Sequence, residues 1–288
     1  MRQGVTNVKK TKLQKLVLFL FFILFMLYAL TLVFPFLWTL YNSLKDNREF
    51  FSAGGVWSLP HDWLLVNYAK VWKEYNIPVY FGNSIKITLA GTALTVMSSA
   101  VTAYVVAKYD FLFRKAIYGM ALAVMLFPAI GSISALYQFM NDSGLYNTHM
   151  GIIILHASGF GLNFLVLYSF FQGISWSYAE AAFVDGATDW QVFRKVMLPQ
   201  AKPALGAISI ISGIGIWNDY FTPWMFLADK DKYTLALGLR QIVLEQSYAA
   251  DWPKLFAAMI IVTVPVLIVY SFFQNTVIEN TVSGGLKG

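Results

Sequence analysis

The sequence predicts an all-α membrane protein with six transmembrane helices and both termini in the cytoplasm. Hydrophobic residues make up 58% of the 288-residue chain and charged residues only 12%, which leaves too little polar surface to cover a water-soluble globule. Six apolar runs are each long enough to cross about 30 Å of hydrocarbon as a helix. The net charge of +6 comes from basic residues beside these runs, where they act as topology signals and do not indicate nucleic-acid binding.

The six predicted transmembrane helices lie at residues 16–40, 84–106, 116–140, 150–173, 204–228 and 255–278. A basic arm, residues 1–15, precedes the first. This run is longer than a signal-peptide core and lacks a clear small-residue cleavage site, so we expect a retained anchor. The basic arm, Lys108 to Lys115 and Arg194 to Lys202 all fall on one side under this topology. That side is therefore the cytoplasm.

Two longer segments fall on the opposite side, where their charges cancel. The first, residues 41–82, is rich in tryptophan and tyrosine, and we expect it to lie partly helical at the outer headgroup level. The alternative is a docking or sugar-stacking surface. The second, residues 229–254, is long and polar enough to project from the membrane and touch a soluble partner.

The most informative polar stretch is residues 177–203, between the fourth and fifth predicted helices. Ser177 and Glu180 have the spacing of a capping box, in which a hydroxyl and a carboxylate accept unpaired backbone N–H groups at a helix start. Gly186 stands where this first short helix must turn, because a left-handed backbone is nearly free for glycine.

A second short helix is predicted after Gly186. Thr188 and Gln191 repeat the capping-box spacing, and Pro199 is expected to end the helix. Its apolar stripe consists of Trp190, Phe193 and Met197, with Arg194 and Lys195 turned away. We expect this loop to hold a fixed shape.

A few polar residues lie inside the predicted spans, where they are costly. They are Asn163 in the fourth span and Trp217, Asn218, Asp219 and Tyr220 in the fifth. Asp219 would sit about 22 Å up its helix, and an ionisable group there is expected to face a cavity or partner helix and to line a solute pathway. The alternative is that Asp219 is solvated at the outer interface or caps a kink at Pro223.

The sequence predicts no enzyme and no cofactor. It contains no GxxxxGK[ST] for a nucleotide phosphate, no HExxH and no GxSxG. His61, His149 and His156 are too scattered for a metal site, and we expect His156 to be a hydrogen-bond partner in helix packing.

Residues 180–203 resemble the cytoplasmic signature of binding-protein-dependent ABC importer permeases, which reads EAA, then DGA, a spaced apolar residue and LP followed by a further proline. The matching residues here are Glu180, Ala181, Ala182, Asp185, Gly186, Ala187, Phe193, Val196, Leu198, Pro199 and Pro203. Val196 replaces the commoner isoleucine. From about Gly82 onward the chain resembles the six-span partner in carbohydrate importers of the maltose type, with a WNDY run, Pro223 and a glycine-rich tail.

The resemblance implies a type I ABC importer permease fold in the cell membrane, with a permease core at residues 83–280 and a cytoplasmic tail at 281–288. It implies a second homologous permease as a heterodimer partner, a cytoplasmic ABC ATPase dimer, a solute-binding protein outside and a sugar substrate. The residues implied to couple to the ATPase are Glu180, Ala181, Ala182, Asp185, Gly186, Ala187, Phe193, Leu198 and Pro199. In the tail, Gly284, Gly285, Lys287 and Gly288 are implied to reach it.

Three alternatives stay open at this point. The chain could belong to an ABC importer of a non-sugar solute. It could be an ion-coupled secondary carrier, for which Asp219 is the one acid well inside a predicted span. It could also be a membrane-bound assembly or receptor subunit without transport. Dependence on ATP and on a separate binding protein distinguishes these classes.

Overall fold

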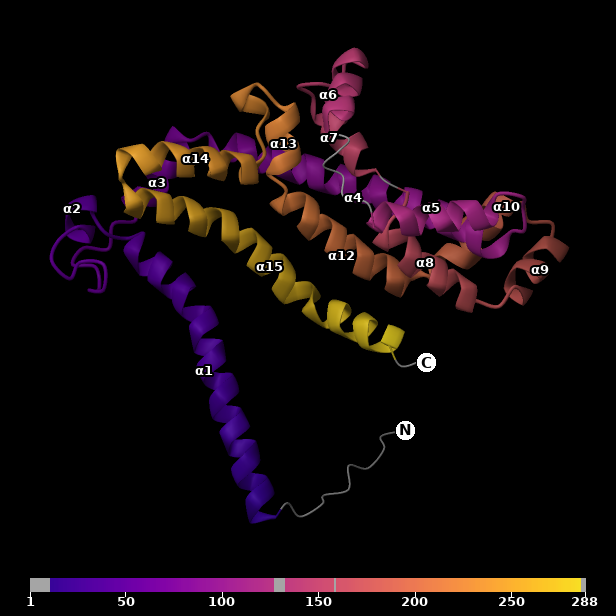
Figure 1. The fold of residues 1–288 in the computed structure, drawn as a ribbon, viewed down its shortest axis with the longest axis horizontal. Helices are drawn as coiled ribbons and strands as arrows, with labels where there is room; N and C mark the ends of the chain where they lie inside the picture. Colours follow the sequence, from indigo (N-terminus) through magenta and orange to yellow (C-terminus); the bar gives the residue numbers. More distant parts are fainter. Residues whose placement is uncertain (1–10, 127–132, 158, 286–288) are drawn as a thin grey trace. The chain divides into compact units, whose positions relative to one another are not determined.

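The computed structural model describes residues 11–126, 133–157 and 159–285 (Figure 1). Within these ranges every regular element is a helix, which confirms the all-α prediction. The chain forms two compact units, one made of residues 1–70 and 250–260 and the other of residues 71–249 and 261–288.

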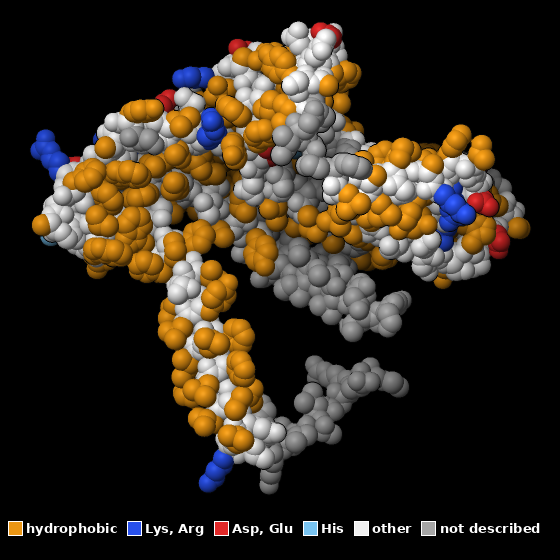
Figure 2. Space-filling view, in the orientation of Figure 1, with side chains coloured by type: hydrophobic (Ala, Val, Ile, Leu, Met, Phe, Trp, Pro, Cys, Tyr) orange, Lys and Arg blue, Asp and Glu red, His pale blue; other side chains and the backbone are white. Residues whose placement is uncertain are grey.

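The first unit begins with α1 (Lys12–Asn42), which contains the first predicted span. A capping box starts the helix, because the Gln14 N–H donates to Thr11 Oγ1 and the Thr11 N–H donates to Gln14 Oε1. The side chains of α1 are apolar all round and almost all exposed, as Figure 2 shows for its visible face. A helix of this kind belongs in lipid or among other helices.

A buried lysine organises the segment that follows α1. Lys45 is fully buried, and its Nζ donates to Asn42 Oδ1 at 2.8 Å and to the carbonyls of Gly55 and Ser58. Asn67 Nδ2 donates to the carbonyls of Ser43 and Lys45, both at 2.8 Å. These bonds join residues 42–45 to residues 55–67, so this part of the predicted outer segment is a folded element that contains α2 (Asn47–Phe50).

The second unit holds most of the helices. They are α4 (Ile77–Lys108), α5 (Arg114–Leu126), α6 (Ile133–Asp142), α7 (His149–His156), α8 (Leu162–Gly173), α9 (Ser177–Val184), α10 (Asp189–Val192), α11 (Leu198–Gln200), α12 (Lys202–Asn218), α13 (Phe221–Phe226) and α14 (Leu235–Ala249). A π turn, Phe193–Met197, joins α10 to α11, and a 3-10 turn, Lys230–Lys232, precedes α14. Two further helices, α3 (Val66–Glu74) and α15 (Trp252–Gly285), run from one unit into the other.

The centre of the second unit is α4, which packs along α7, α8 and α12. Small residues let the backbones approach closely: a Cβ on Gly91 would lie 3.1 Å from Ile216 Cδ1, and one on Gly213 would lie 3.4 Å from Thr92 Oγ1. Close approach through glycine is typical of helix packing in membranes. A large apolar cluster joins the C-terminal half of α4 to α8 and to the helices of residues 177–208.

Three helices are long and apolar enough to cross a membrane within the described residues, namely Lys12–Asn42, Ile77–Lys108 and Trp252–Phe272. The prediction of continuous fourth and fifth spans was wrong. Residues 150–173 divide into α7 and α8, with Gly161 at φ +88° between them. Residues 204–228 divide into α12 and α13, because Asp219 leaves the helical region at ψ 112°. The predicted third span, 116–140, becomes α5 and α6, and residues 127–132 between them lie outside the described residues.

Candidate functional site

The polar loop of residues 177–203 has the turn that its glycine predicts. Gly186 adopts φ +80° directly after α9. Its N–H donates to the Phe183 carbonyl and the N–H of Ala187 donates to the Ala182 carbonyl, both at 3.0 Å. These are the two bonds of a Schellman motif, and they satisfy carbonyls at the end of α9.

The two predicted helix caps have different outcomes. The box at Thr188 is confirmed, because its N–H donates to Gln191 Oε1 at 2.9 Å and its hydroxyl accepts from the Gln191 N–H at 3.4 Å. The predicted box at Ser177 and Glu180 was wrong. The helix starts one residue earlier, with Trp176 in the capping position, and the Ser177 hydroxyl instead bonds the Ser175 hydroxyl at 2.8 Å.

The second half of the loop is anchored in the protein core. Phe193 and Met197 are buried in the large apolar cluster, and Leu198 packs against it, whereas Trp190 is 57% exposed. The predicted stripe is therefore only partly buried. The helical backbone also continues through Pro199 to Gln200, contrary to expectation. Pro199 directly follows the π turn Phe193–Met197 and lies in the first turn of the short helix α11 (Leu198–Gln200), so the chain passes the proline where the regular α-helical bonding is already changed.

The face of α9 opposite the core was not fully recognised from the sequence. Ala179 is completely buried, and Ala182 and Phe183 pack on the core. Tyr178 and Val184, which we did not single out, are 55% and 87% exposed, and Ala181 lies exposed between them. Their spacing of three residues places all three on one helix face. This spacing of three residues was the signal in the sequence from which the exposed face of α9 could have been predicted.

The remaining signature residues lie near this face. Glu180, Asp185 and Gly186 are exposed, Ala187 is half-buried and Pro199 is exposed. The residues implied to couple to an ATPase thus divide into two groups. Glu180, Ala181, Asp185, Gly186 and Pro199 are exposed at the surface. Ala182, Ala187, Phe193 and Leu198 belong to the core cluster or pack against it and fix the loop there.

One candidate pathway residue, Asp219, lies where the helix of the fifth predicted span is interrupted, close to the end of α7. Asp219 Oδ1 accepts the backbone N–H groups of Phe221 at 2.8 Å and Thr222 at 3.1 Å, so it caps α13. Its Oδ2 lies 3.6 Å from Nε2 of His156, the last residue of α7. Asp219 therefore combines both of the roles considered for it, a cap and a partner to another helix. The Thr95 hydroxyl donates to the backbone carbonyl of His156, which ties the end of α7 to α4. The imidazole Nε2 of His156 is buried and has no hydrogen-bond partner among the described residues, so the bond expected of this side chain is not seen at that atom.

The other pathway candidates do not join this pair. Asn163 Nδ2 donates to Ser212 Oγ at 2.9 Å, which connects α8 to α12. Asn218 Nδ2 donates to the Ile214 carbonyl within its own helix, and Tyr220 is 47% exposed.

Trp217 lies beside a largely apolar groove of about 790 Å³ between α4, α12 and α15. The hydroxyls of Thr88 and Thr92 and the indole N–H of Trp217 line this groove and are buried without a hydrogen-bond partner among the described residues.

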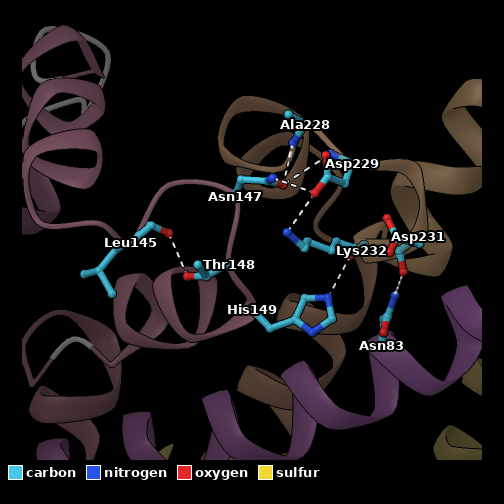
Figure 3. Close-up of polar contacts among 9 residues, drawn as sticks. All are labelled: Asn83, Leu145, Asn147, Thr148, His149, Ala228, Asp229, Asp231 and Lys232. Carbon is cyan, nitrogen blue, oxygen red and sulfur yellow. Dashed lines mark hydrogen bonds and ion pairs between the residues drawn. The ribbon is translucent and has the colours of Figure 1, made fainter.

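A polar network lies between the connection before α7 and the residues that follow α13 (Figure 3). Asn147, at φ +56°, accepts the backbone N–H groups of Ala228 and Asp229 and donates to Asp229 Oδ2 at 2.7 Å. Lys232 Nζ lies 2.8 Å from the same carboxylate oxygen, and His149 bonds the Lys232 carbonyl. The connection that precedes α7 is thereby fixed to the loop that precedes α14.

The predicted tail is only partly described. Gly284 and Gly285 form the last turn of α15, which extends seven residues beyond the predicted end of the sixth span at 278. Lys287 and Gly288 lie outside the described residues.

Known proteins match this chain over most of its length. The family described as "Binding-protein-dependent transport system inner membrane component" matches residues 96–281. The diacetylchitobiose uptake system permease protein NgcG of Streptomyces coelicolor is 36% identical over 262 residues, which cover 90% of this chain and 86% of that protein. The maltose/maltodextrin transport system permease protein MalG of Vibrio vulnificus is 30% identical over 220 residues, or 74% of each chain.

A solved structure shares the fold. The crystal structure of a bacterial ABC transporter involved in the import of the acidic polysaccharide alginate contains a chain that aligns with a TM-score of 0.83 at 24% identity, covering 93% of this chain and 99% of that one. Together with the family match and the loop at residues 177–203, this agreement identifies the chain as a member of the binding-protein-dependent transport system inner membrane component family, the membrane-embedded permeases of ABC importers.

Proposed function

We propose that this chain is one of two permease subunits in an ATP-driven importer of a sugar or oligosaccharide. Relatives named for diacetylchitobiose and for maltose and maltodextrin support the substrate class. The observation that carries the proposal is the loop of residues 177–203, which presents Glu180, Asp185 and Gly186 at the surface while Phe193 and Met197 lie buried in the core. A loop held in this way moves as a body with the helices on which it packs.

In the proposed assembly the chain crosses the plasma membrane six times, with both termini in the cytoplasm. The crossings are α1, α4, α5 with α6, α7 with α8, α12 with α13, and α15. The loop at 177–203 then faces a cytoplasmic ATPase dimer, which the tail residues Gly284 to Gly288 also approach. A second, different permease completes the pathway, and a solute-binding protein docks outside on residues 41–82 and 229–254.

The mechanism is alternating access. When ATP closes the ATPase dimer, the two coupling loops are carried together, and the paired permeases turn their cavity outward to receive the solute. We place the solute path at the interruptions of the fourth and fifth spans, beside Asp219 and His156, with Asn163, Trp217, Asn218 and Tyr220 as further lining residues. Interrupted helices at membrane depth are tolerated where they line a cavity or are buried in protein.

One observation favours a second candidate, an ion-coupled carrier. His156 and Asp219 form an ionisable pair inside the spans, and such pairs serve as proton relays in secondary transporters. The two candidates differ in their energy source, because only the importer needs ATP and a binding protein.

Both candidates are tested by isolating the tagged chain gently from its native membrane and identifying its companions by mass spectrometry. We expect a second permease, a Walker-motif ATPase and a solute-binding protein. The recovered complex is then placed in vesicles, and uptake of labelled diacetylchitobiose, maltose and a non-sugar amino acid is compared with ATP inside. Isolation of the chain alone, with uptake driven by a proton gradient and indifferent to ATP, would establish the carrier instead.

A further inference from the structure

An uninterrupted helix joins the cytoplasmic and outer ends of the second unit. From Ile77 to Lys108, α4 runs for 32 residues, which corresponds to about 48 Å. The helix pairs packed against it are interrupted, α7 and α8 around Gly161, and α12 and α13 at Asp219. A continuous helix transmits displacement along its axis, whereas a broken one bends at its break.

At its cytoplasmic end α4 is bonded directly to the polar loop. Tyr109, the capping residue of α4, donates from its hydroxyl to Asp189 Oδ1 at 2.6 Å across 80 residues of sequence. Asp189 is the first residue of α10 and follows the confirmed capping box at Thr188. Burial raises the pKa of the Tyr109 hydroxyl, and its hydrogen bond to Asp189 raises it further, so the hydroxyl keeps its proton and remains the donor.

Packing supports this bond on both sides. The ring of Tyr109 packs edge-on against the ring of Trp176, the residue before α9, with 5.8 Å between the ring centroids. The ring centroids of Tyr104 and Phe193 lie 5.0 Å apart. Lys108 Nζ donates to the carbonyl of Ile174, at the end of α8. The last turn of α4 thus holds the loop before α9, the start of α10 and the end of α8 together.

The outer end of α4 is bonded in a corresponding way. Asn83 Nδ2 donates to the carbonyl of Asp231 at 2.8 Å, a bond drawn in Figure 3, and to that of Tyr233 at 3.0 Å. Ser84 Oγ accepts the N–H of Leu235, the first residue of α14, at 2.8 Å. Twenty-five residues, or about 38 Å of helix, separate Ser84 from Tyr109.

We propose that α4 is the rigid arm that carries displacement of the loop at 177–203 to the outer loop at 229–235, and that the hydrogen bond between Tyr109 and Asp189 engages it. The inference rests on the proposed importer function and adds a positioning pair to it. Tyr109 and Asp189 act through α4 and do not touch the solute. Neither belongs to the signature residues of the loop.

The test uses the complete importer, with its partner permease and ATPase, in lipid nanodiscs. The chain contains no cysteine, so Gly82→Cys gives it a single reporter at the outer end of α4, where a Cβ meets nothing within 4 Å. The rate of maleimide labelling of this chain is measured without nucleotide and after vanadate trapping of the ATPase. We expect trapping to change the rate.

Adding Tyr109→Phe removes only the hydroxyl and keeps the ring. We expect the nucleotide-dependent change to disappear and the solute transported per ATP hydrolysed to fall about tenfold, which corresponds to about 1.4 kcal/mol lost from a bond to a charged group. The matched control is Tyr168→Phe, which removes a hydroxyl that accepts from Gln172 within α8 at 2.8 Å. The control should keep both the labelling change and the transport ratio.

Asp189→Asn completes a double-mutant cycle. If both residues act through one bond, the double variant is no worse than either single one. The proposal is overturned if Tyr109→Phe retains the labelling change, if Tyr168→Phe loses it equally, or if the reporter does not respond to trapping while ATP-driven uptake proceeds. In each of these cases the proposed function stands, because only uptake indifferent to ATP contradicts that function.

Discussion

The turn at Gly186 offers a direct test of whether a partner approaches the loop closely. Gly186 adopts φ +80°, and a Cβ added there would meet nothing within 4 Å. Replacement therefore costs only the left-handed backbone, about 1–2 kcal/mol for most residues and less for asparagine. Because the surrounding space is open, this cost is expected to be the same for Gly186→Ala and Gly186→Leu. The size of the new side chain should not affect folding of the isolated chain.

Import should depend on that size. If an ATPase surface lies against the turn, Gly186→Leu should abolish ATP-driven uptake, Gly186→Ala should reduce it modestly, and Gly186→Asn should fall between them despite its lower backbone cost. The measurements are membrane insertion, the thermal midpoint of the purified chain in detergent, and uptake by the reconstituted importer. Equal uptake by the alanine and leucine variants would refute close approach. If the thermal midpoint fell steadily as the side chain at position 186 became larger, the space around Gly186 would not be open in the isolated chain.

Further predictions concern three other sites. Glu180→Gln should change the free energy of unfolding by no more than about 0.5 kcal/mol, as a neutral surface substitution does, because Glu180 is exposed and caps no helix. The same variant should lower uptake. A clear loss of stability would show instead that Glu180 has a structural role. Thr188→Ala should cost about 1 kcal/mol through its lost cap, measured as a lower midpoint that Thr188→Ser restores. Lys45→Met should leave three buried acceptors unpaired and cost about 3 kcal/mol or more, read out as protease cleavage between residues 43 and 67. Burial lowers the pKa of the Lys45 ammonium group below its ordinary 10.5, so the unfolded chain binds the ammonium proton more tightly than the folded chain does. The free energy of unfolding should therefore rise with pH up to about 10.5. The Lys45→Met variant should lack that rise.

Local signals in the sequence were reliable where the local backbone decides the outcome. The turn at Gly186 and the capping box at Thr188 depend on neighbouring residues alone, and both are present. The box at Ser177 failed because tertiary packing sets the start of α9. The ring of Trp176 packs between the rings of Tyr109 and Phe183, at centroid distances of 5.8 Å and 6.0 Å, and this packing fixes Trp176 in the capping position. The partner Tyr109 lies 67 residues away in sequence and could not be inferred from the loop.

Hydrophobicity identified apolar segments that are largely helical, but it did not predict where their helices are interrupted. An average over about 20 residues does not register a single Gly161 at positive φ or a single Asp219 with a strand-like ψ. Residues 41–82, the predicted outer segment, are a second case in which the sequence pattern did not predict which side chains are buried. Trp57 and Trp63 are 70% and 67% exposed, whereas Tyr80 is buried. The buried Lys45 that holds the segment together resembles an ordinary surface lysine in sequence.

The interruptions themselves support the proposed position of the solute path. In hydrocarbon an unpaired backbone group costs several kcal/mol, so a break in a span persists only beside protein partners or water. Asp219 satisfies two N–H groups at the start of α13 and lies 3.6 Å from His156 at the end of α7. Asp219 therefore satisfies the backbone at its own break and lies beside the last helical residue before the other break. A solute that enters at the proposed site would meet these polar groups, and in the proposed mechanism the adjoining α4, which is continuous from Ile77 to Lys108, keeps its length while the interrupted helices move.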